Sequence, residues 1–141
     1  MLNYMRKYFE ILFRFAANLY DHLNAEIGLG SVTDVNEAIE WLGYTYLFVR
    51  MRKNPTVYGV SVEELTNDPV LRRRRQELIE NAASQLHRNQ MIVFEKKTGS
   101  FIRKDLGRIA ASFYIKMKSV ETFNKVMHPR MVEGMVKYLW H

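Results

Sequence analysis

The chain is 141 residues long, which fits one domain with at most a short appended piece. Hydrophobic residues make up 48% and charged residues 26%, as in a globular protein with a buried core. Because no cysteine is present, disulfides and thiolate metal sites are excluded, and a reducing compartment is expected.

The net charge of +6 is distributed unevenly along the chain. Residues 1–70 contain 6 Lys or Arg and 9 Asp or Glu, a balance of −3, whereas residues 71–141 contain 15 and 6, a balance of +9. The basic second half indicates an acidic partner, and both nucleic acid and an acidic protein surface satisfy that requirement.

The first 23 residues are apolar and aromatic but do not form the pattern of a membrane span. Arg6, Lys7, Glu10 and Arg14 interrupt the apolar run, which a span needs over roughly 20 residues. The same charges argue against a secretory signal, although the amphipathic pattern leaves a mitochondrial presequence open. We expect a helix whose apolar side packs on protein, and a nuclear and/or cytoplasmic location.

A helix is predicted from Val35 to about Lys53. Asp34 is a good N-cap, Glu37 stands where a capping-box carboxylate belongs, and Pro55 disfavours helical geometry at the preceding residue. The apolar residues that recur at helical spacing in this segment are Val35, Ala38, Ile39, Leu42, Tyr46 and Val49.

Two more helices are predicted after it. Ser61 and Glu64 form a second capping-box pattern, which indicates a short helix over residues 62–66. Asp68 followed by Pro69 indicates that a third helix opens there, since proline is favoured at the first helical position. Its predicted buried stripe consists of Leu71, Leu78, Ile79, Ala82 and Leu86.

The pattern then changes to two short β-type runs, residues 91–94 and 100–102. Between them, Gly99 supplies the positive φ that a hairpin loop of this length usually needs. Helix, short helix, helix and hairpin is the order of a winged helix. The predicted fold is therefore mainly α with a small β-hairpin: a winged helix flanked by N- and C-terminal helices.

Two helices are predicted after the hairpin. Asp105 is expected to cap the first, with Leu106, Ile109, Ala110 and Phe113 facing inward. Ser119 is expected to cap the second, which ends near Pro129. The predicted organisation is an N-terminal helical segment over residues 1–30, a winged-helix domain over 31–104 and a C-terminal segment over 105–141.

Several collinear stretches resemble a known family: residues 23–59, DPVLRRRR (68–75), MIVFEKKTGSF (91–101), DLGRIAASFYI (105–115) and VETFN (120–124). They resemble the segment that follows the second RecA-like domain in the large tandem-cassette DExH-box helicases. This family includes the spliceosomal snRNP helicase and the helicase subunit of the activating signal cointegrator complex, and details such as MIVFEKKTG look closer to the latter. The resemblance implies a winged helix that joins the helicase motor to a helical ratchet domain. Asp105 onward would be the connecting helix and Ser119 onward the start of a truncated ratchet.

Three departures from the family pattern stand out. Residues 1–18 do not resemble the end of the family's second motor domain. Ala111-Ser112-Phe113 stands where the family usually has Ser-His-Tyr, so any contact made by that histidine is in doubt. After Met127 the resemblance fades.

No catalytic, cofactor or metal site is predicted. The sequence contains neither the glycine-rich phosphate loop with its lysine nor a DExH motif, so ATP hydrolysis by this chain alone is not expected. The four histidines are scattered without the spacing of metal ligands.

The candidate sites are basic. The run Arg72, Arg73, Arg74 and Arg75 falls in the third helix, the recognition helix of winged helices that read DNA, and Lys96, Lys97, Arg103 and Lys104 fall on the wing. These residues could contact phosphates, or form a solvated face that docks on an acidic surface of the motor. The docking interpretation is favoured because consecutive arginines spread around all sides of a helix.

The sequence is compatible with three functions. The first is a non-catalytic module or fragment of an ATP-dependent helicase, whose partners are the motor and ratchet domains, with RNA or DNA contacts through the basic half. The second is a free-standing winged-helix protein that binds nucleic acid. The third is a protein-interaction fragment whose apolar N-terminal helix docks on a partner or on a membrane surface.

Overall fold

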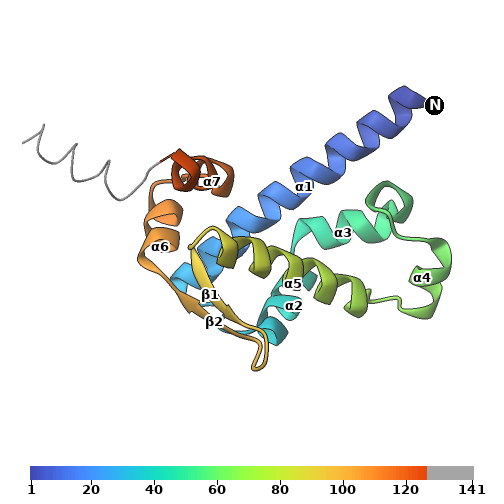
Figure 1. Cartoon of the computed structure of the whole chain (residues 1–141). Helices are drawn as coiled ribbons and strands as arrows, with labels where there is room; N and C mark the ends of the chain where they lie inside the picture. The colour runs from blue at the N-terminus through green and yellow to red at the C-terminus, as the bar shows by residue number, and fades with distance from the viewer. Residues whose placement is uncertain (127–141) are drawn as a thin grey trace, which may run out of the picture.

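The structure, a computed structural model, describes residues 1–126 (Figure 1). The elements in chain order are α1 (Leu2–Leu29), α2 (Val35–Gly43), α3 (Tyr46–Lys53), the 3-10 helix η1 (Pro55–Tyr58), α4 (Val62–Asn67), α5 (Arg72–Arg88), β1 (Ile92–Glu95), β2 (Ser100–Arg103), α6 (Asp105–Ser112) and α7 (Met117–Val126). This order confirms the predicted fold class, a winged helix flanked by additional helices at both ends.

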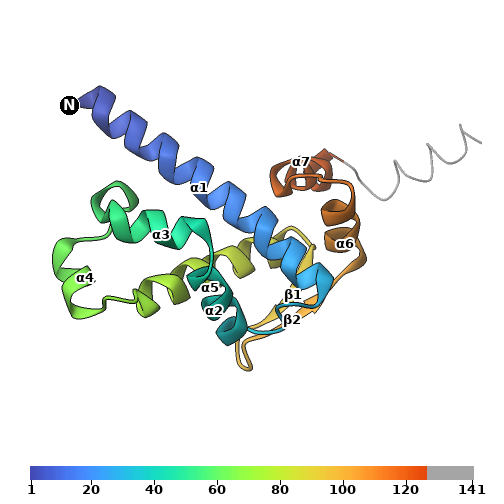
Figure 2. The same cartoon turned by 180° about the vertical axis from the view of Figure 1, so that it is seen from behind.

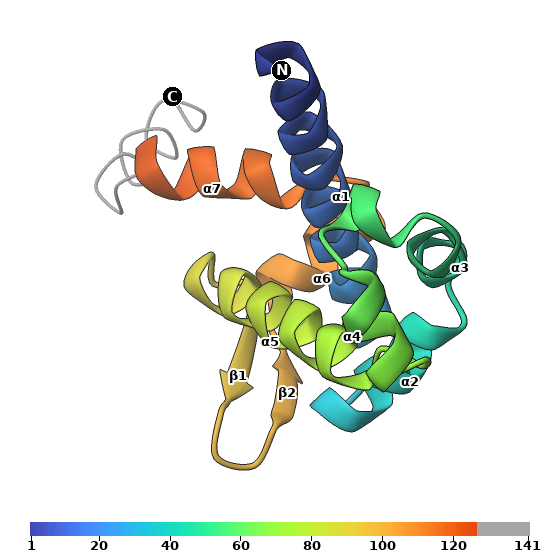
Figure 3. The same cartoon turned by 90° about the vertical axis from the view of Figure 1, so that its right-hand side faces the viewer.

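The main core lies where the second half of α1 crosses α5, with α2 and the hairpin closing it (Figure 3). Its large side chains come from every one of these elements: Leu23, Ile39, Leu42, Ile79, Leu86, Met91 and Ile92 are each at most 1% exposed. Of the stripe predicted for the third helix, Ile79, Ala82 and Leu86 lie in this core, Leu78 packs against it half-buried, and Leu71 lies in a second, smaller core with Phe48 and Met51. Apolar burial of this kind is the main driving force for the fold.

The wing is a two-stranded antiparallel sheet in which Phe94 lies opposite Phe101. Gly99 closes its loop with a φ of 74°, as predicted. Backbone hydrogen bonds tie the wing to the start of α2, because the Val35 amide donates to the Gly99 carbonyl (2.9 Å) and the Phe101 amide to the Thr33 carbonyl (2.8 Å). The wing is therefore held at a fixed position beside the helix-turn-helix.

The predicted single helix over residues 35–53 is wrong, because the structure divides it into α2 and α3. Thr45 starts the second helix: its hydroxyl accepts a hydrogen bond from the Phe48 amide (3.4 Å). The break also changes which face is buried. Phe48 and Met51 point into the interior, whereas Tyr46, predicted inward, is 75% exposed.

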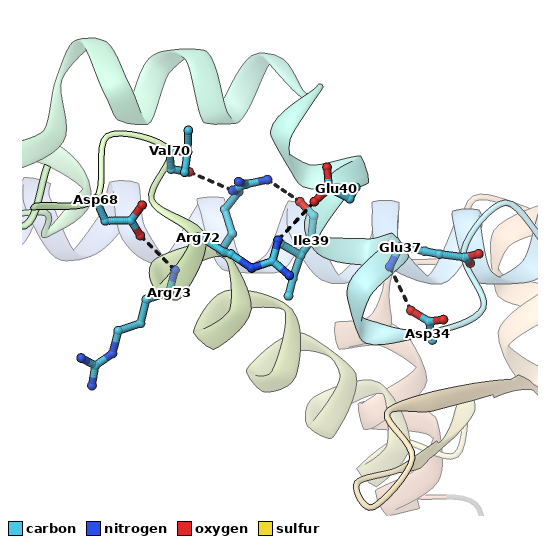
Figure 4. Close-up of polar contacts among 9 residues, drawn as sticks. Asp34, Glu37, Ile39, Glu40, Asp68, Val70, Arg72 and Arg73 are labelled. Carbon is cyan, nitrogen blue, oxygen red and sulfur yellow. Dashed lines mark hydrogen bonds and ion pairs between the residues drawn. The ribbon is translucent and has the colours of Figure 1, made fainter.

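The predicted start of the third helix at Asp68-Pro69 is also wrong. These residues form a turn in which the Leu71 amide donates to the Asp68 carbonyl (2.9 Å), and Leu71 itself has a positive φ of 48°. The helix α5 begins only at Arg72. Asp68 nevertheless caps it, because its carboxylate accepts from the Arg73 amide (3.2 Å; Figure 4).

The inward face predicted for α6 is largely wrong. Ala110 is buried, but Leu106, Ile109 and Phe113 are 36%, 47% and 73% exposed. The helix instead turns its small residues towards α1, where Gly107 accepts a hydrogen bond at its carbonyl from the Asn24 side chain (2.9 Å). An apolar stripe of α6 is left on the surface.

The last described helix, α7, begins at Met117 and not at Ser119 as predicted. Its first amide donates to the carboxylate of Asp21 on α1 (2.7 Å), so the cap comes from a residue distant in sequence. Asp105 does not cap α6 either: it is the first helical residue, after Lys104 at the N-cap position. The predicted end near Pro129 lies outside the described residues.

The helix α1 is continuous over 28 residues, about 42 Å at the usual rise per residue. Its second half packs in the core through Leu19, Leu23 and Ile27. Its first half projects beyond the rest of the fold (Figure 2). There the apolar side chains of Leu2 and Met5 are exposed, so this part of α1 presents apolar surface to solvent.

Candidate nucleic-acid interface

The arginine run occupies the first turn of α5, but its four side chains have different environments. Arg75 is buried, Arg74 is partly buried, and Arg72 and Arg73 are exposed. Consecutive residues on a helix point about 100° apart, which is why one run reaches both the core and the solvent. The four residues therefore do not act as one basic surface.

Arg75 uses its guanidinium inside the fold. Its Nε donates to the Val70 carbonyl (3.0 Å), one Nη donates to the Ile39 carbonyl (2.8 Å), and the group lies 5.0 Å from the centre of the Phe48 ring. Gly43 makes room for it, because a Cβ at that position would lie 2.7 Å from the same Nη atom. Arg75 therefore joins the end of α2 to the start of α5.

The other three arginines face carboxylates of the same domain. Arg72 pairs with Glu40 of α2 (3.3 Å; Figure 4), while Arg73 and Arg74 lie 3.7 and 3.5 Å from the two oxygens of Glu77. Exposed pairs of this kind contribute little to stability, but they reduce the positive potential that a phosphate backbone would meet.

The wing carries two basic pairs with distinct surroundings. Lys96 and Lys97 are exposed near the hairpin tip. Arg103 and Lys104 lie at the other end, where Arg103 donates to the Gly28 carbonyl at the end of α1 (3.2 Å) and Lys104 to the Gln90 side chain (2.8 Å). Of these four wing residues, only Lys96 and Lys97 make no hydrogen bond or ion pair within residues 1–126.

A polar cleft of about 520 Å³ separates the wing tip from α5. Lys96 and Lys97 line one wall, and Glu77, Glu80 and Asn81 of α5 line the other. The surface that a recognition helix would present to a nucleic-acid groove is therefore of mixed charge. Two carboxylates at this position would repel phosphates.

A second cleft, of about 610 Å³, lies between α1, the α2–α3 junction and η1. Its polar and aromatic lining consists of Arg14, Phe15, Asn18, His22, Trp41, Thr45, Tyr46, Arg50, Asn54 and Tyr58. None of the described residues that line it is acidic. Local sequence patterns do not reveal this cleft, because α1 and α3 are separate in sequence and only the fold brings their basic and aromatic residues together.

Within residues 1–126, no group of three or more His, Asp or Glu side chains is arranged to hold a metal ion. In the same part of the chain, no helix is both long enough and apolar enough to cross a membrane.

The helix-turn-helix, the wing attached to it and the flanking helices define a winged-helix module. The chain belongs to the winged helix-turn-helix domain family, whose model matches residues 13–88. The RQC trigger complex helicase SLH1 of Saccharomyces cerevisiae is 58% identical over 121 residues, which cover 86% of this chain. Human activating signal cointegrator 1 complex subunit 3 is 48% identical over the same length, and the human U5 small nuclear ribonucleoprotein 200 kDa helicase is 44% identical over 117 residues, 83% of the chain.

These matches confirm the resemblance to the winged-helix segment of the large helicases. The chain spans only about 6% of the length of each of these relatives. It therefore corresponds to one small part of a helicase.

Proposed function

We propose that this chain is a non-catalytic winged-helix module of an ATP-dependent DExH-box helicase, which packs against the motor and ratchet domains and helps to guide nucleic acid. The observation that carries the proposal is that the positive charges of α5 are largely neutralised. Its arginines are buried or paired, and Glu77 and Glu80 lie on its exposed side. A recognition helix neutralised in this way suits domain packing better than reading of a duplex.

The surfaces offered for packing are apolar and lie at both ends of the module. Leu106 and Ile109 of α6 and Phe113 directly after it are exposed, and Leu2 and Met5 present apolar surface on α1. Exposed apolar patches bordered by charged residues are typical of protein interaction sites. Arg72 and Arg73, which are exposed, are the docking candidates for an acidic motor surface.

Two measurements on the full chain test this proposal. An ATPase assay with and without RNA should stay at background, and robust turnover would overturn the non-catalytic assignment. Titration with the isolated motor of a related helicase should give binding that weakens when Phe113 is changed to Ser or Arg73 to Ala. Tyr44→Ala, a change of another exposed aromatic residue, is the control for non-specific loss of apolar surface.

A free-standing nucleic-acid-binding protein is the second candidate, and the exposed Lys96 and Lys97 favour it. Titration with duplex and single-stranded oligonucleotides at two salt concentrations distinguishes it from the first. Tight duplex binding that weakens steeply with salt and is lost in Lys96→Ala/Lys97→Ala would support it. No duplex binding at low salt would exclude it.

A further inference from the structure

The cleft between α1, the α2–α3 junction and η1 differs from the rest of the surface in its combination of side chains. Arg14 of α1 lies on one wall and Tyr46 and Arg50 of α3 on another, and Trp41 and Asn54 are also part of the lining. Its volume of about 610 Å³ falls within the range of pockets that enclose small organic ligands.

The cleft has a rigid frame. The Phe15 ring of α1 meets the Tyr58 ring of η1 edge to face, with the ring centres 5.5 Å apart. Leu42, which is fully buried, and Leu19 form part of the lining and belong to the main core. The walls of the cleft are therefore fixed by packing before a ligand binds.

The arginines of this cleft differ from the arginine run on α5 because they are not paired with carboxylates. Arg50 makes no ion pair within the described part of the chain, and its guanidinium lies 5.6 Å from the centre of the Tyr46 ring. Arg14 is exposed and also has no ion pair within residues 1–126. In contrast, Arg72 and Arg73 face carboxylates.

An unpaired guanidinium beside the exposed Tyr46 ring, with that of Arg14 in the same cleft, suits a ligand that has both negative charges and flat apolar faces. Single-stranded nucleic acid has both, since its bases stack on aromatic side chains and its phosphates meet basic residues. An acidic peptide supplies the charges but has no regular series of planar groups. The exposed Tyr46 ring and the amides of Asn18 and Asn54 are better matched by unpaired bases.

We propose that this cleft binds a short stretch of single-stranded nucleic acid, with a base stacked at Tyr46 or Trp41 and phosphates at Arg14 and Arg50. The inference rests on the proposed role of the module in guiding nucleic acid and assigns that role to a specific surface. It places the strand at α1 and α3, away from α5 and the wing.

Tryptophan fluorescence tests the proposal directly. The chain has two tryptophans, so Trp140→Phe leaves Trp41 as the sole reporter in an otherwise complete chain. Short oligouridylate and oligothymidylate are the probes. We expect quenching of Trp41 and an affinity that falls with salt by a log–log slope of about −0.7 for each phosphate contact.

Single substitutions of exposed residues then identify the site. Arg14→Ala and Arg50→Ala should each reduce the magnitude of the salt slope by about 0.7. Tyr46→Ala should weaken binding roughly tenfold, within the range measured for loss of one stacking platform. Tyr44→Ala and Arg73→Ala are matched controls outside the cleft, and they should leave the slope, the affinity and the quenching unchanged.

Each alternative outcome has a separate meaning. Binding without quenching of Trp41, or binding lost in Lys96→Ala/Lys97→Ala but not in Arg14→Ala, would overturn the cleft proposal and leave the guiding role in place. Quenching of Trp41 by oligoglutamate as strong as that by the oligonucleotides would show an acidic-peptide site instead. No binding at low salt would overturn both the cleft proposal and the guiding role, without affecting the proposed packing against the motor.

Discussion

Replacing Arg75 with alanine should lower the free energy of unfolding by about 3 kcal/mol. The guanidinium makes two hydrogen bonds to backbone carbonyls, at 2.8 and 3.0 Å, and hydrogen bonds from charged donors contribute about 1.5–3 kcal/mol each. Desolvation of the buried cation offsets part of this contribution. The loss also removes the packing of the group against Phe48.

Urea unfolding followed by circular dichroism measures the effect, together with the melting temperature. For a chain of this size, a loss of 3 kcal/mol corresponds to a decrease in Tm of roughly 10 °C. Arg75→Lys should recover only part of the stability, because a single ammonium group cannot reach both carbonyls as a planar guanidinium does.

Arg73→Ala is the matched control, since it removes the same charge from the same turn of α5 at a side chain that is 90% exposed. Its cost should stay within about 0.5 kcal/mol. If Arg75→Ala costs no more than Arg73→Ala, then the hydrogen bonds of Arg75 do not join α2 to α5. The run could then act as a uniform basic surface.

Three further substitutions test other contacts. Gly43→Ala should destabilise the wild-type chain by displacing the Arg75 guanidinium, but should be neutral or stabilising in an Arg75→Ala background; equal effects in the two backgrounds would contradict the contact. Gly107→Ala should cost several kcal/mol of stability, because the added Cβ would overlap the backbone carbonyl of Met91 at the base of the wing. Gly28→Ala on α1 is the control and should cost nothing, because its Cβ would make only an ordinary contact; similar melting temperatures for the two variants would refute this. Asp21→Ala should remove about 1 kcal/mol of N-cap stabilisation and increase hydrogen exchange at the start of α7, and unchanged protection there would argue against the cap.

Local signals in the sequence predicted several elements correctly. The N-caps predicted at Asp34 and Ser61 are confirmed by hydrogen bonds from the amides three residues later (2.9 and 3.0 Å), although the Glu37 carboxylate accepts from the Thr33 amide and not from that of Asp34. Gly99 correctly indicated the hairpin. These features depend on residues a few positions apart, so the sequence contains all the information that they need.

The features that were missed depend on contacts between distant segments. Apolar spacing continues through Tyr44 and Thr45, so periodicity alone could not reveal the break between α2 and α3. The burial of Arg75 requires the Ile39 carbonyl, 36 positions away, and the space at Gly43. Likewise, the basic residues of the α1–α3 cleft come together only in three dimensions.

The helix α1 contacts most of the other elements of the module. It packs against α5 in the main core, and its Asn24 side chain donates a hydrogen bond to the Gly107 carbonyl of α6. Its Asp21 carboxylate caps α7, and its Gly28 carbonyl accepts a hydrogen bond from Arg103 of the wing. No loop interrupts it between these contacts and its projecting first half. Any change in the direction of α1 would therefore displace the wing, α6 and α7 together, because all three are hydrogen-bonded to this one helix.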